Sequence, residues 1–187
     1  MNRDEERLKY VNNFLAYTSL DDIDWDTIVI ERELTEEFIR MFADKLDWVY
    51  ISQYQKLSES FIREFKDKVD WDEITLHQNL SEDFIREFKD YVDWVYVARF
   101  QKLSENFIRE FADYVDWEVL SKFQILSEDF IREFQDKLDW EYISYVQPLS
   151  EGFIREFKDK VDWVNIFNYQ ELSDEFKKEF KHRVYIN

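Results

Sequence analysis

The side chains best suited to acid–base or metal chemistry in this chain are two histidines among many carboxylates. His77 and His182 stand far apart in the sequence, where related segments carry an aromatic residue and an aspartate. Imidazoles titrate near neutral pH and bind metals, but these two share no pattern that would bring them to one site. Carboxylate pairs occur throughout, so none stands out as an acid–base pair, and the serines lack a Gly-x-Ser-x-Gly elbow. We therefore predict a protein that is not an enzyme, with no catalytic, cofactor-binding or metal-binding residues.

The composition removes several other kinds of site. The 187 residues include one Gly, one Pro and no Cys, but 7 Trp, 11 Tyr and 18 Phe. Phosphate-binding loops need several glycines, so neither a P-loop nor a dinucleotide-binding fingerprint is available. Without Cys there are no disulfides and no thiolate ligands, which suits an intracellular protein. The scarcity of Gly and Pro also argues against an all-β sandwich or barrel, whose tight turns depend on them.

The charge of the chain limits its partners. The 43 acidic residues outnumber the 25 Lys and Arg, for a formal net charge of −18. Because phosphate contacts come from clustered Lys and Arg, we expect no direct binding to nucleic acid, and a basic protein is the partner that this charge favours. No apolar run approaches the roughly 20 residues of a membrane span, and the acidic start is unlike a secretory or transit peptide. We expect a soluble, intracellular protein without a membrane partner.

A repeat of 23 residues accounts for nearly the whole chain. An Asp precedes every Trp, a Leu followed by Ser or Thr stands nine residues after it, and Phe stands 13 and 17 residues after it. The tryptophans, which begin repeats 1 to 7, are Trp25, Trp48, Trp71, Trp94, Trp117, Trp140 and Trp163. Tandem copies without an insertion indicate a single repeat array.

Each repeat has the pattern of two short helices. In repeat 3, Asp70 can cap a first helix that begins at Trp71, and Glu73 resembles the far residue of a capping box. Ser81 can cap a second, amphipathic helix of about eleven residues ending near Val92. Capping side chains thus restart the chain in a new direction without glycine.

These patterns predict an all-α fold, an α-solenoid (superhelix) of tandem 23-residue two-helix repeats with degenerate terminal caps. We predict one repeat domain over residues 1–187. It consists of an N-terminal half-repeat cap (1–24), with a helix over residues 5–17, six full repeats (25–162), and the seventh repeat with a C-terminal cap (163–187). The partner, the curvature and the oligomeric state are not fixed by these patterns.

Two recurring polar series have both a structural and a functional interpretation. A Gln stands seven residues after most tryptophans, and we expect its amide to bond the turn between helices or the next repeat's backbone, in preference to a ligand. An Arg stands 15 residues after the Trp in repeats 1 to 6, on the outer face of the second helix. One interpretation of this arginine series is a stripe that binds anions. However, acids flank the arginines: Arg63 has Glu59 four residues before it and Asp67 four residues after it. We therefore favour a solvated, salt-bridged face.

Function is expected where the repeats differ from one another. The two residues after each Trp vary between repeats, and the helical wheel places the first away from the core and the second on its flank. Tyrosines recur at the second position in every other repeat, and aromatic residues of this kind are favoured at interfaces. The predicted partner-binding residues are Val49, Tyr50, Val95, Tyr96, Glu141 and Tyr142.

The segment from Leu80 to Phe88, followed by Val92, Asp93 and Trp94, resembles short, acidic, aromatic-rich helical repeats of uncharacterised proteins from large DNA viruses or phages. This resemblance covers all seven copies. It implies an α-solenoid and a viral setting, hence the host cytoplasm, without fixing an activity.

Two functions are compatible with these observations. The first is a non-catalytic interaction scaffold that binds a basic protein through the variable face of the solenoid. The alternative is an acidic decoy that mimics nucleic acid and inhibits a nucleic-acid-binding or defence protein, because the chain carries dense carboxylates and no basic stripe free of acids.

Overall fold

A computed structural model describes Arg7, Lys9 and residues 19–185. Within these residues every regular element is helical, and the fold is the α-solenoid predicted from the repeat. The chain divides into two compact parts, residues 1–93 and 94–187. The helix predicted over residues 5–17 lies outside the described residues, apart from Arg7 and Lys9. The described cap residues include a short 3₁₀ helix η1 (Leu20–Asp22), with Leu20 and Ile23 buried beside it.

Each Trp begins a seven-residue α-helix, called here a first helix. The first helices are α2 (Trp25–Glu31), α4 (Trp48–Tyr54), α6 (Trp71–His77), α8 (Trp94–Phe100), α10 (Trp117–Phe123), α12 (Trp140–Val146) and α14 (Trp163–Tyr169). The second helices are α3 (Glu36–Met41), α5 (Glu59–Glu64), α7 (Glu82–Glu87), α9 (Glu105–Glu110), α11 (Glu128–Glu133), α13 (Glu151–Glu156) and α15 (Asp174–Phe180). A 3₁₀ helix, η2 (Lys181–Tyr185), packs against α14 and α15. None of the described helices combines the length and apolar character needed to cross a bilayer.

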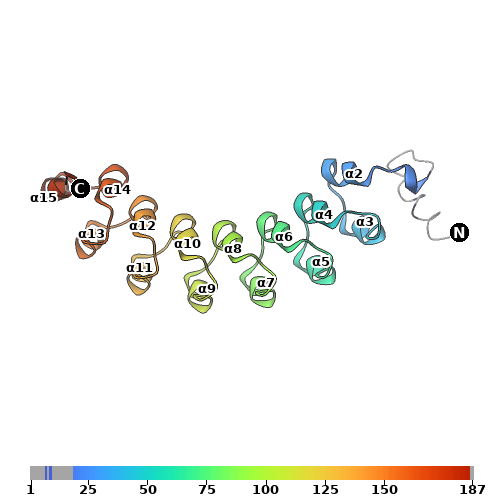
Figure 1. Ribbon diagram of the computed structural model, residues 1–187, viewed down its shortest axis with the longest axis horizontal. Helices are drawn as coiled ribbons and strands as arrows, with labels where there is room; N and C mark the ends of the chain where they lie inside the picture. The colour runs from blue at the N-terminus through green and yellow to red at the C-terminus, as the bar shows by residue number, and fades with distance from the viewer. Residues whose placement is uncertain (1–6, 8, 10–18, 186–187) are drawn as a thin grey trace. The chain divides into compact units, whose positions relative to one another are not determined.

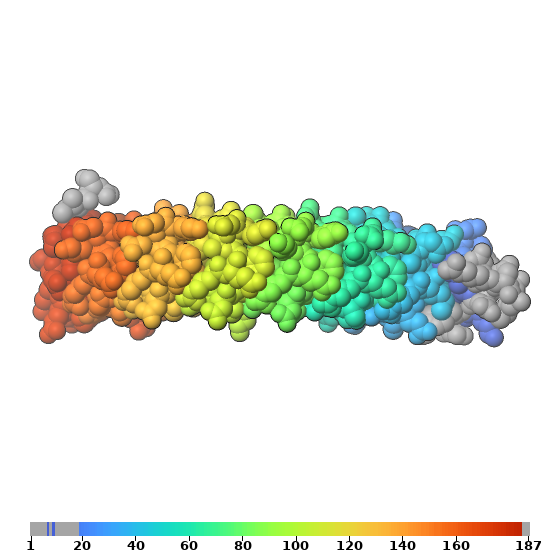
Figure 2. Space-filling view, turned by 90° about the horizontal axis from the view of Figure 1, so that it is seen from below, coloured from blue at the N-terminus to red at the C-terminus, as the bar shows by residue number. Residues whose placement is uncertain are grey.

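Within each part, first and second helices occupy opposite sides (Figure 1). In residues 1–93, α2 packs against α4 and α4 against α6; in residues 94–187, the contacts run α8 to α10, α10 to α12 and α12 to α14. Figure 2 views the molecule from the side of the second helices, and within each part the repeats follow one another in chain order. The first helices therefore form a row in each part, with a shared outer surface.

The predicted helix caps are confirmed. The carboxylate of Asp70 accepts the N–H of Glu73 at 3.0 Å, and the Ser81 hydroxyl oxygen accepts the N–H of Phe84 at 3.2 Å. The capping box predicted with Glu73 is wrong, because the Asp70 N–H donates to the hydroxyl of Ser52 in the preceding first helix, α4, at 3.0 Å. The donor that a capping box would satisfy thus joins the start of α6 to α4.

The second helix is shorter than predicted. In repeat 3, α7 spans six residues, and its last turn is followed by a tighter one in which Tyr91 N–H donates to Phe88 O at 2.9 Å. A tryptophan bonds the turn that follows the second helix: the Trp71 indole N–H donates to Lys66 O, two residues beyond the end of α5, at 3.0 Å, and Trp117 does the same to Ala112. This bond ties the turn to the start of the next first helix.

The core is a stack of aromatic groups supplied by each repeat. Phe130 is fully buried, and Trp117 lies across it and against Phe134, with ring centres 4.9 Å apart in the second pair. The tryptophans themselves are only half-buried. In repeats 2 to 7 a cation or a tyrosine lies against the tryptophan, as Lys137 does at Trp117 and Tyr91 at Trp71. Each of these repeats therefore closes its own aromatic layer at the surface.

Candidate protein-interaction surface

The recurring glutamines are used to join repeats. Gln55 Nε2 donates to the carbonyls of Val29 (2.6 Å) and Arg32 (2.8 Å), and its Oε1 accepts the N–H of Leu34 at 2.7 Å. Gln78, Gln124, Gln147 and Gln170 repeat these contacts. The expected ladder is confirmed, but each amide bonds the preceding repeat, not the next one. These glutamines are therefore not available to a ligand.

Small hydroxyls on the first helices form a second ladder that sequence reasoning missed. Ser121 is fully buried; its hydroxyl donates to Trp117 O at 2.6 Å and accepts, at 3.0 Å, the N–H of Asp139, which caps the next first helix, α12. Ser144 makes the same pair of bonds. The signal was present, because Ser or Thr stands four residues after the Trp in repeats 2, 3, 5 and 6.

The arginine series of the second helices is held by acids of two repeats. Arg63 Nε donates to Glu87 at 2.6 Å, a second guanidinium nitrogen lies 3.7 Å from Glu59, and the guanidinium sits 4.9 Å from the centre of the Phe84 ring. The salt-bridged face is confirmed, although the acid of the next repeat takes the place expected for Asp67. Equivalent pairs join Arg40 to Glu64, Arg109 to Glu133, Arg132 to Glu156 and Arg155 to Glu179.

Carboxylates at the start of the second helices also link repeats. Glu151 Oε1 accepts the backbone N–H of Ser173 at 2.7 Å, and this bond, with that of the Ser173 hydroxyl, lowers the pKa of the Glu151 carboxyl below its ordinary value. Partial burial raises the pKa of Glu36, but bonds from Ser58 and the charge of Arg40 outweigh it, so the net pKa is lowered. These acids stay ionised because ionisation strengthens the contact between repeats.

The predicted partner-binding residues fall into two classes. Val49, Val95 and Glu141 are exposed on their first helices, as the helical wheel predicted. Tyr50, Tyr96 and Tyr142 are half-buried on the flank, again as predicted. The tyrosines are partly engaged by neighbouring side chains: the Tyr50 ring lies 6.1 Å from that of Tyr54, Tyr96 lies equally far from Phe100, and Lys122 lies over Tyr142.

A further set of exposed aromatic and aliphatic side chains lies elsewhere on the first helices, five and six residues after the Trp. In residues 94–187 they form a row that we call the aromatic edge, made of Phe100, Phe123, Tyr145 and Tyr169, which are 39% to 57% exposed. Tyr54 and Ile30 hold corresponding places in residues 1–93, at 49% and 46%. No second helix in the described part of the chain carries a large hydrophobic side chain that is exposed.

Cations lie within the aromatic edge. The Arg99 guanidinium is 4.9 Å from the Phe100 ring and 4.8 Å from the Phe123 ring of the next repeat. Lys122 lies 5.5 Å from Phe123 and 4.8 Å from Tyr142. Arg99 and Lys122 offset Glu118 and Glu141, so the four helices α8, α10, α12 and α14 carry no net charge. The edge is thus apolar and neutral beside second helices that carry an excess of acids.

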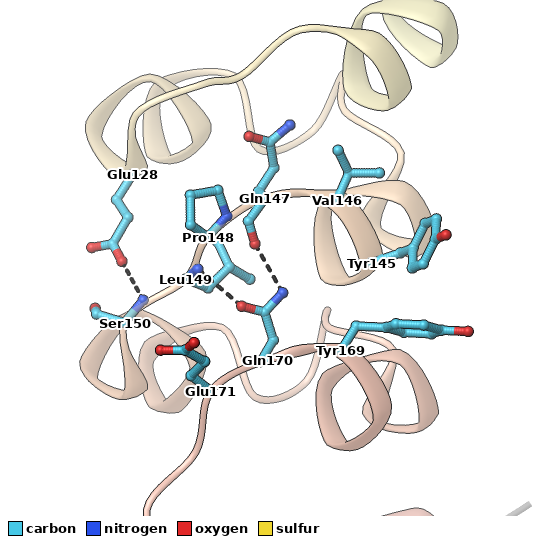
Figure 3. Close-up of a pocket in the computed structure, with 10 residues that line it drawn as sticks. All are labelled: Glu128, Tyr145, Val146, Gln147, Pro148, Leu149, Ser150, Tyr169, Gln170 and Glu171. Carbon is cyan, nitrogen blue, oxygen red and sulfur yellow. Dashed lines mark hydrogen bonds between the residues drawn. The ribbon is translucent and has the colours of Figure 1, made fainter.

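A groove opens at one end of the aromatic edge, between the helix-joining turns of repeats 6 and 7 (Figure 3). Its volume is about 620 Å³. Tyr145 and Tyr169 stand at one end, Glu128 and Glu171 at the other, and Gln170 lies between them. Its lining residues are Glu128, Tyr145, Val146, Gln147, Pro148, Leu149, Ser150, Tyr169, Gln170 and Glu171.

The histidines show no shared site. His77 Nε2 lies 3.1 Å from Glu73 on the same helix, and His182 is exposed in η2. Among Arg7, Lys9 and residues 19–185, no group of three His, Asp or Glu side chains is arranged to hold a metal ion. Comparison of the chain with family models, with curated proteins and with solved structures found no match. The surface chemistry described above is therefore the basis for a functional proposal.

Proposed function

We propose that this protein is a non-catalytic interaction scaffold that binds a basic protein partner through the variable face of its first helices. One observation carries the proposal: nine of the twelve described side chains that are large, apolar and exposed lie on first helices, while the second helices carry none and repeat one ion-paired pattern. Of the other three, Ile125 follows a first helix, and Tyr91 and Tyr114 lie in the turns after α7 and α9, where they pack against tryptophans. Exposed aromatic residues are favoured at protein interfaces, and a row of them is unusual on a surface that only faces water.

The charge distribution supports a basic partner. The aromatic edge is neutral, but the rest of the chain brings the net charge to −18. An acidic body raises the local concentration of a basic protein and speeds its association, while an apolar patch holds it once bound. In this proposal Val95 and Glu141 flank the aromatic edge of residues 94–187, and Tyr96 and Tyr142 support it from the half-buried flank. Val49 and Tyr50 hold the corresponding places beside Tyr54 in residues 1–93.

The nucleic-acid-mimicking decoy is the alternative, and the ion pairs argue against it. The carboxylates of Glu87, Glu133, Glu156 and Glu179 each pair with an arginine of the preceding repeat. A mimic of the phosphate backbone needs carboxylates that are free to meet basic groups of its target. The viral setting implied by the resemblance, and with it a host-cytoplasm location, stays a prediction.

Affinity capture from the native cell with two matched variants tests the proposal. The edge variant carries Phe100→Gln, Phe123→Gln, Tyr145→Gln and Tyr169→Gln; the control carries Lys158→Gln and Glu175→Gln on the side of the second helices, with no change in net charge. We expect the control to retain the partner and the edge variant to lose at least about tenfold in affinity, since a few aromatic residues dominate most interfaces.

Two results would argue against the scaffold. Equal capture by the parent, the control and the edge variant would exclude the aromatic edge as the contact. Capture that ignores the edge substitutions and falls steeply as salt rises would favour the decoy, because that dependence is typical of a basic nucleic-acid-binding groove. Far-ultraviolet circular dichroism on each variant confirms that folding is retained.

A further inference from the structure

The groove between repeats 6 and 7 differs from the rest of the aromatic edge in lacking an internal cation. Between repeats 4 and 5, Arg99 lies over Phe123. At the same two positions, repeats 6 and 7 carry Tyr145 and Tyr169, whose rings meet edge to face at 4.4 Å and 77°. Over these two rings, no Lys or Arg from the described residues is stacked. The pair thus offers two half-exposed rings at a place where this molecule elsewhere puts a guanidinium.

The opposite end of the groove offers a carboxylate. Glu171 is exposed and makes no ion pair with any part of the chain that the structure describes. Glu128, beside it, is already engaged, because one oxygen accepts the Ser150 N–H at 2.7 Å and the other lies 3.7 Å from Arg132. A positive charge entering the groove would therefore meet Glu171 as its available partner.

Elsewhere in this molecule, the group that stacks on an aromatic ring beside carboxylates is the guanidinium of an arginine. Arg132 lies 5.1 Å from the centre of the Phe153 ring while its Nε donates to Glu156 at 2.9 Å. Arg40, Arg63, Arg109 and Arg155 repeat this arrangement. A planar guanidinium stacks on a ring and bonds carboxylates through its edge, which an ammonium does less well.

The polar groups on the floor of the groove are already hydrogen-bonded, so a ligand would be recognised at the two ends of the groove. Gln170 Nε2 donates to Gln147 O at 2.8 Å, and Gln170 Oε1 accepts the N–H of Leu149 at 3.0 Å. The Ser150 N–H is held by Glu128, and Pro148 has no N–H. These backbone groups are satisfied before a ligand arrives, so the floor is already ordered and offers few donors (Figure 3).

We propose that this groove binds an extended segment of the partner protein, which lays an arginine on the Tyr145–Tyr169 pair and directs a second basic side chain toward Glu171. This inference rests on the proposed function and names the chemistry of the partner at one end of the aromatic edge. The segment completes the ring-and-cation pattern that repeats 4 and 5 complete internally.

Fluorescence anisotropy with the full chain and a short fluorescein-labelled peptide of alternating Gly and Arg tests this proposal. The same peptide with citrulline in place of Arg keeps the shape and removes the charge. We expect Tyr145→Ala and Tyr169→Ala each to weaken binding by about fivefold, and Glu171→Gln by about threefold, because exposed cation–π and ionic contacts are worth about 1 kcal/mol or less. The citrulline peptide should bind at least about tenfold more weakly than the Arg peptide.

Matched substitutions separate this site from general attraction to an acidic protein. Tyr54→Ala removes an equally exposed tyrosine from repeat 2, and Glu33→Gln removes an acid at the place in repeat 1 that Glu171 holds in repeat 7. Both should leave binding unchanged within about twofold. Equal losses from the groove and control variants would overturn the proposal, as would equally tight binding of a proline-rich peptide that lacks Arg, which aromatic grooves can also accept.

The capture experiment distinguishes failure of this inference from failure of the scaffold. If Phe100→Gln with Phe123→Gln abolishes partner capture while Tyr145→Ala, Tyr169→Ala and Glu171→Gln change neither capture nor peptide binding, the groove proposal is wrong and the scaffold stands. If none of these substitutions affects capture, the scaffold proposal itself is wrong.

Discussion

The first and second helices of this protein are built from one repeat but present opposite surfaces. The arginine and glutamate positions of the second helices recur in most repeats because they contact the next repeat: Arg132 bonds Glu156 and covers Phe153. Outward residues of the first helices vary, because the bonds that join these helices run through buried side chains such as Gln124 and Ser121. An outward position of a first helix that makes no contact between repeats can carry different residues in different repeats. The exposed large apolar residues of the first helices lie at such positions.

The difference between the two surfaces shows that positions with the same residue in every repeat are those that hold the solenoid together. A solenoid needs the same contact at every interface between repeats, so positions that supply it must recur. The aromatic edge supplies no such contact in a regular way: its residue is Phe123 in repeat 5 and Tyr169 in repeat 7, and Val146 takes the place in repeat 6. We infer that binding resides on the irregular surface.

Removing one phenylalanine from each surface should affect stability very differently. Phe130→Ala in α11 should lower the free energy of unfolding by about 3–5 kcal/mol, because the ring is fully buried and its loss leaves a cavity. Phe123→Ala in α10, a change of the same size at a 39% exposed site, should cost about 1 kcal/mol or less. Denaturant titration followed by Trp fluorescence measures both. Similar losses would mean that the aromatic edge is structural.

A second test concerns the bonds that join the first helices. Gln124→Ala should lower the free energy of unfolding by about 2–3 kcal/mol, because Ala98 O, Gln101 O and Leu103 N–H lose their partner. Ile125→Ala, at the next residue and 70% exposed, should change it by less than about 0.5 kcal/mol. Thermal melts of the two variants side by side give the comparison. A small effect of Gln124→Ala would show that the amide ladder is dispensable.

The second-helix row can also be improved where it departs from its own pattern. Gly152→Ala in α13 should raise the free energy of unfolding by about 0.5–1 kcal/mol, because Gly loses more backbone freedom than Ala in a helix. An added Cβ has room, since its nearest neighbour beyond the adjacent residues is Ser150 Oγ at 3.8 Å, and the backbone angle φ is not positive. Chemical denaturation of this variant measures the gain; a loss would indicate that Gly152 has a role that its surroundings do not show.

The smallest expected effect is on the pH dependence of stability. Hydrogen bonds from Ser173 lower the pKa of folded Glu151 below its ordinary value of 4.5, so its contribution to stability is fully present above pH 4.5 and is lost as the pH falls through the folded value. Glu151→Gln keeps an acceptor for Ser173 and removes the titration, which should flatten the loss of stability on the acid side. Glu175→Gln controls for the loss of one charge. Identical acid profiles for Glu151→Gln and the parent would contradict the linkage.

The repeat register and the caps of the described helices could be predicted because both depend on residues close in sequence. Ser81 caps a helix that begins at the next residue, and Asp70 does the same. The length of the second helix could not, because the chain passes into a tighter turn at Phe65, and the Trp71 indole then bonds that turn at Lys66 O. Hydrophobic periodicity continues past that point, so the pattern predicted a longer helix.

The candidate surface was predicted only in part for a similar reason. The helical wheel of a single first helix placed Tyr142 on its flank, which is correct. It gave no sign that Tyr145 and Tyr169 meet, because their contact joins residues 24 apart in neighbouring repeats. The same limit hid the Arg132–Glu156 pair and reversed the expected direction of the Gln ladder. Contacts between repeats depend on how helices pack, which composition and spacing within one copy do not fix.

Photo-crosslinking from the two surfaces shows which of them contacts the partner. A benzophenone amino acid replaces Phe123 on the aromatic edge in one protein and Lys158, exposed beside α13 on the other side, in a second. After irradiation in the native cell, we expect the partner to be covalently attached through position 123 and to be absent or weak at position 158. Attachment that is equal at both positions, or stronger at 158, would contradict the assignment of binding to the first helices.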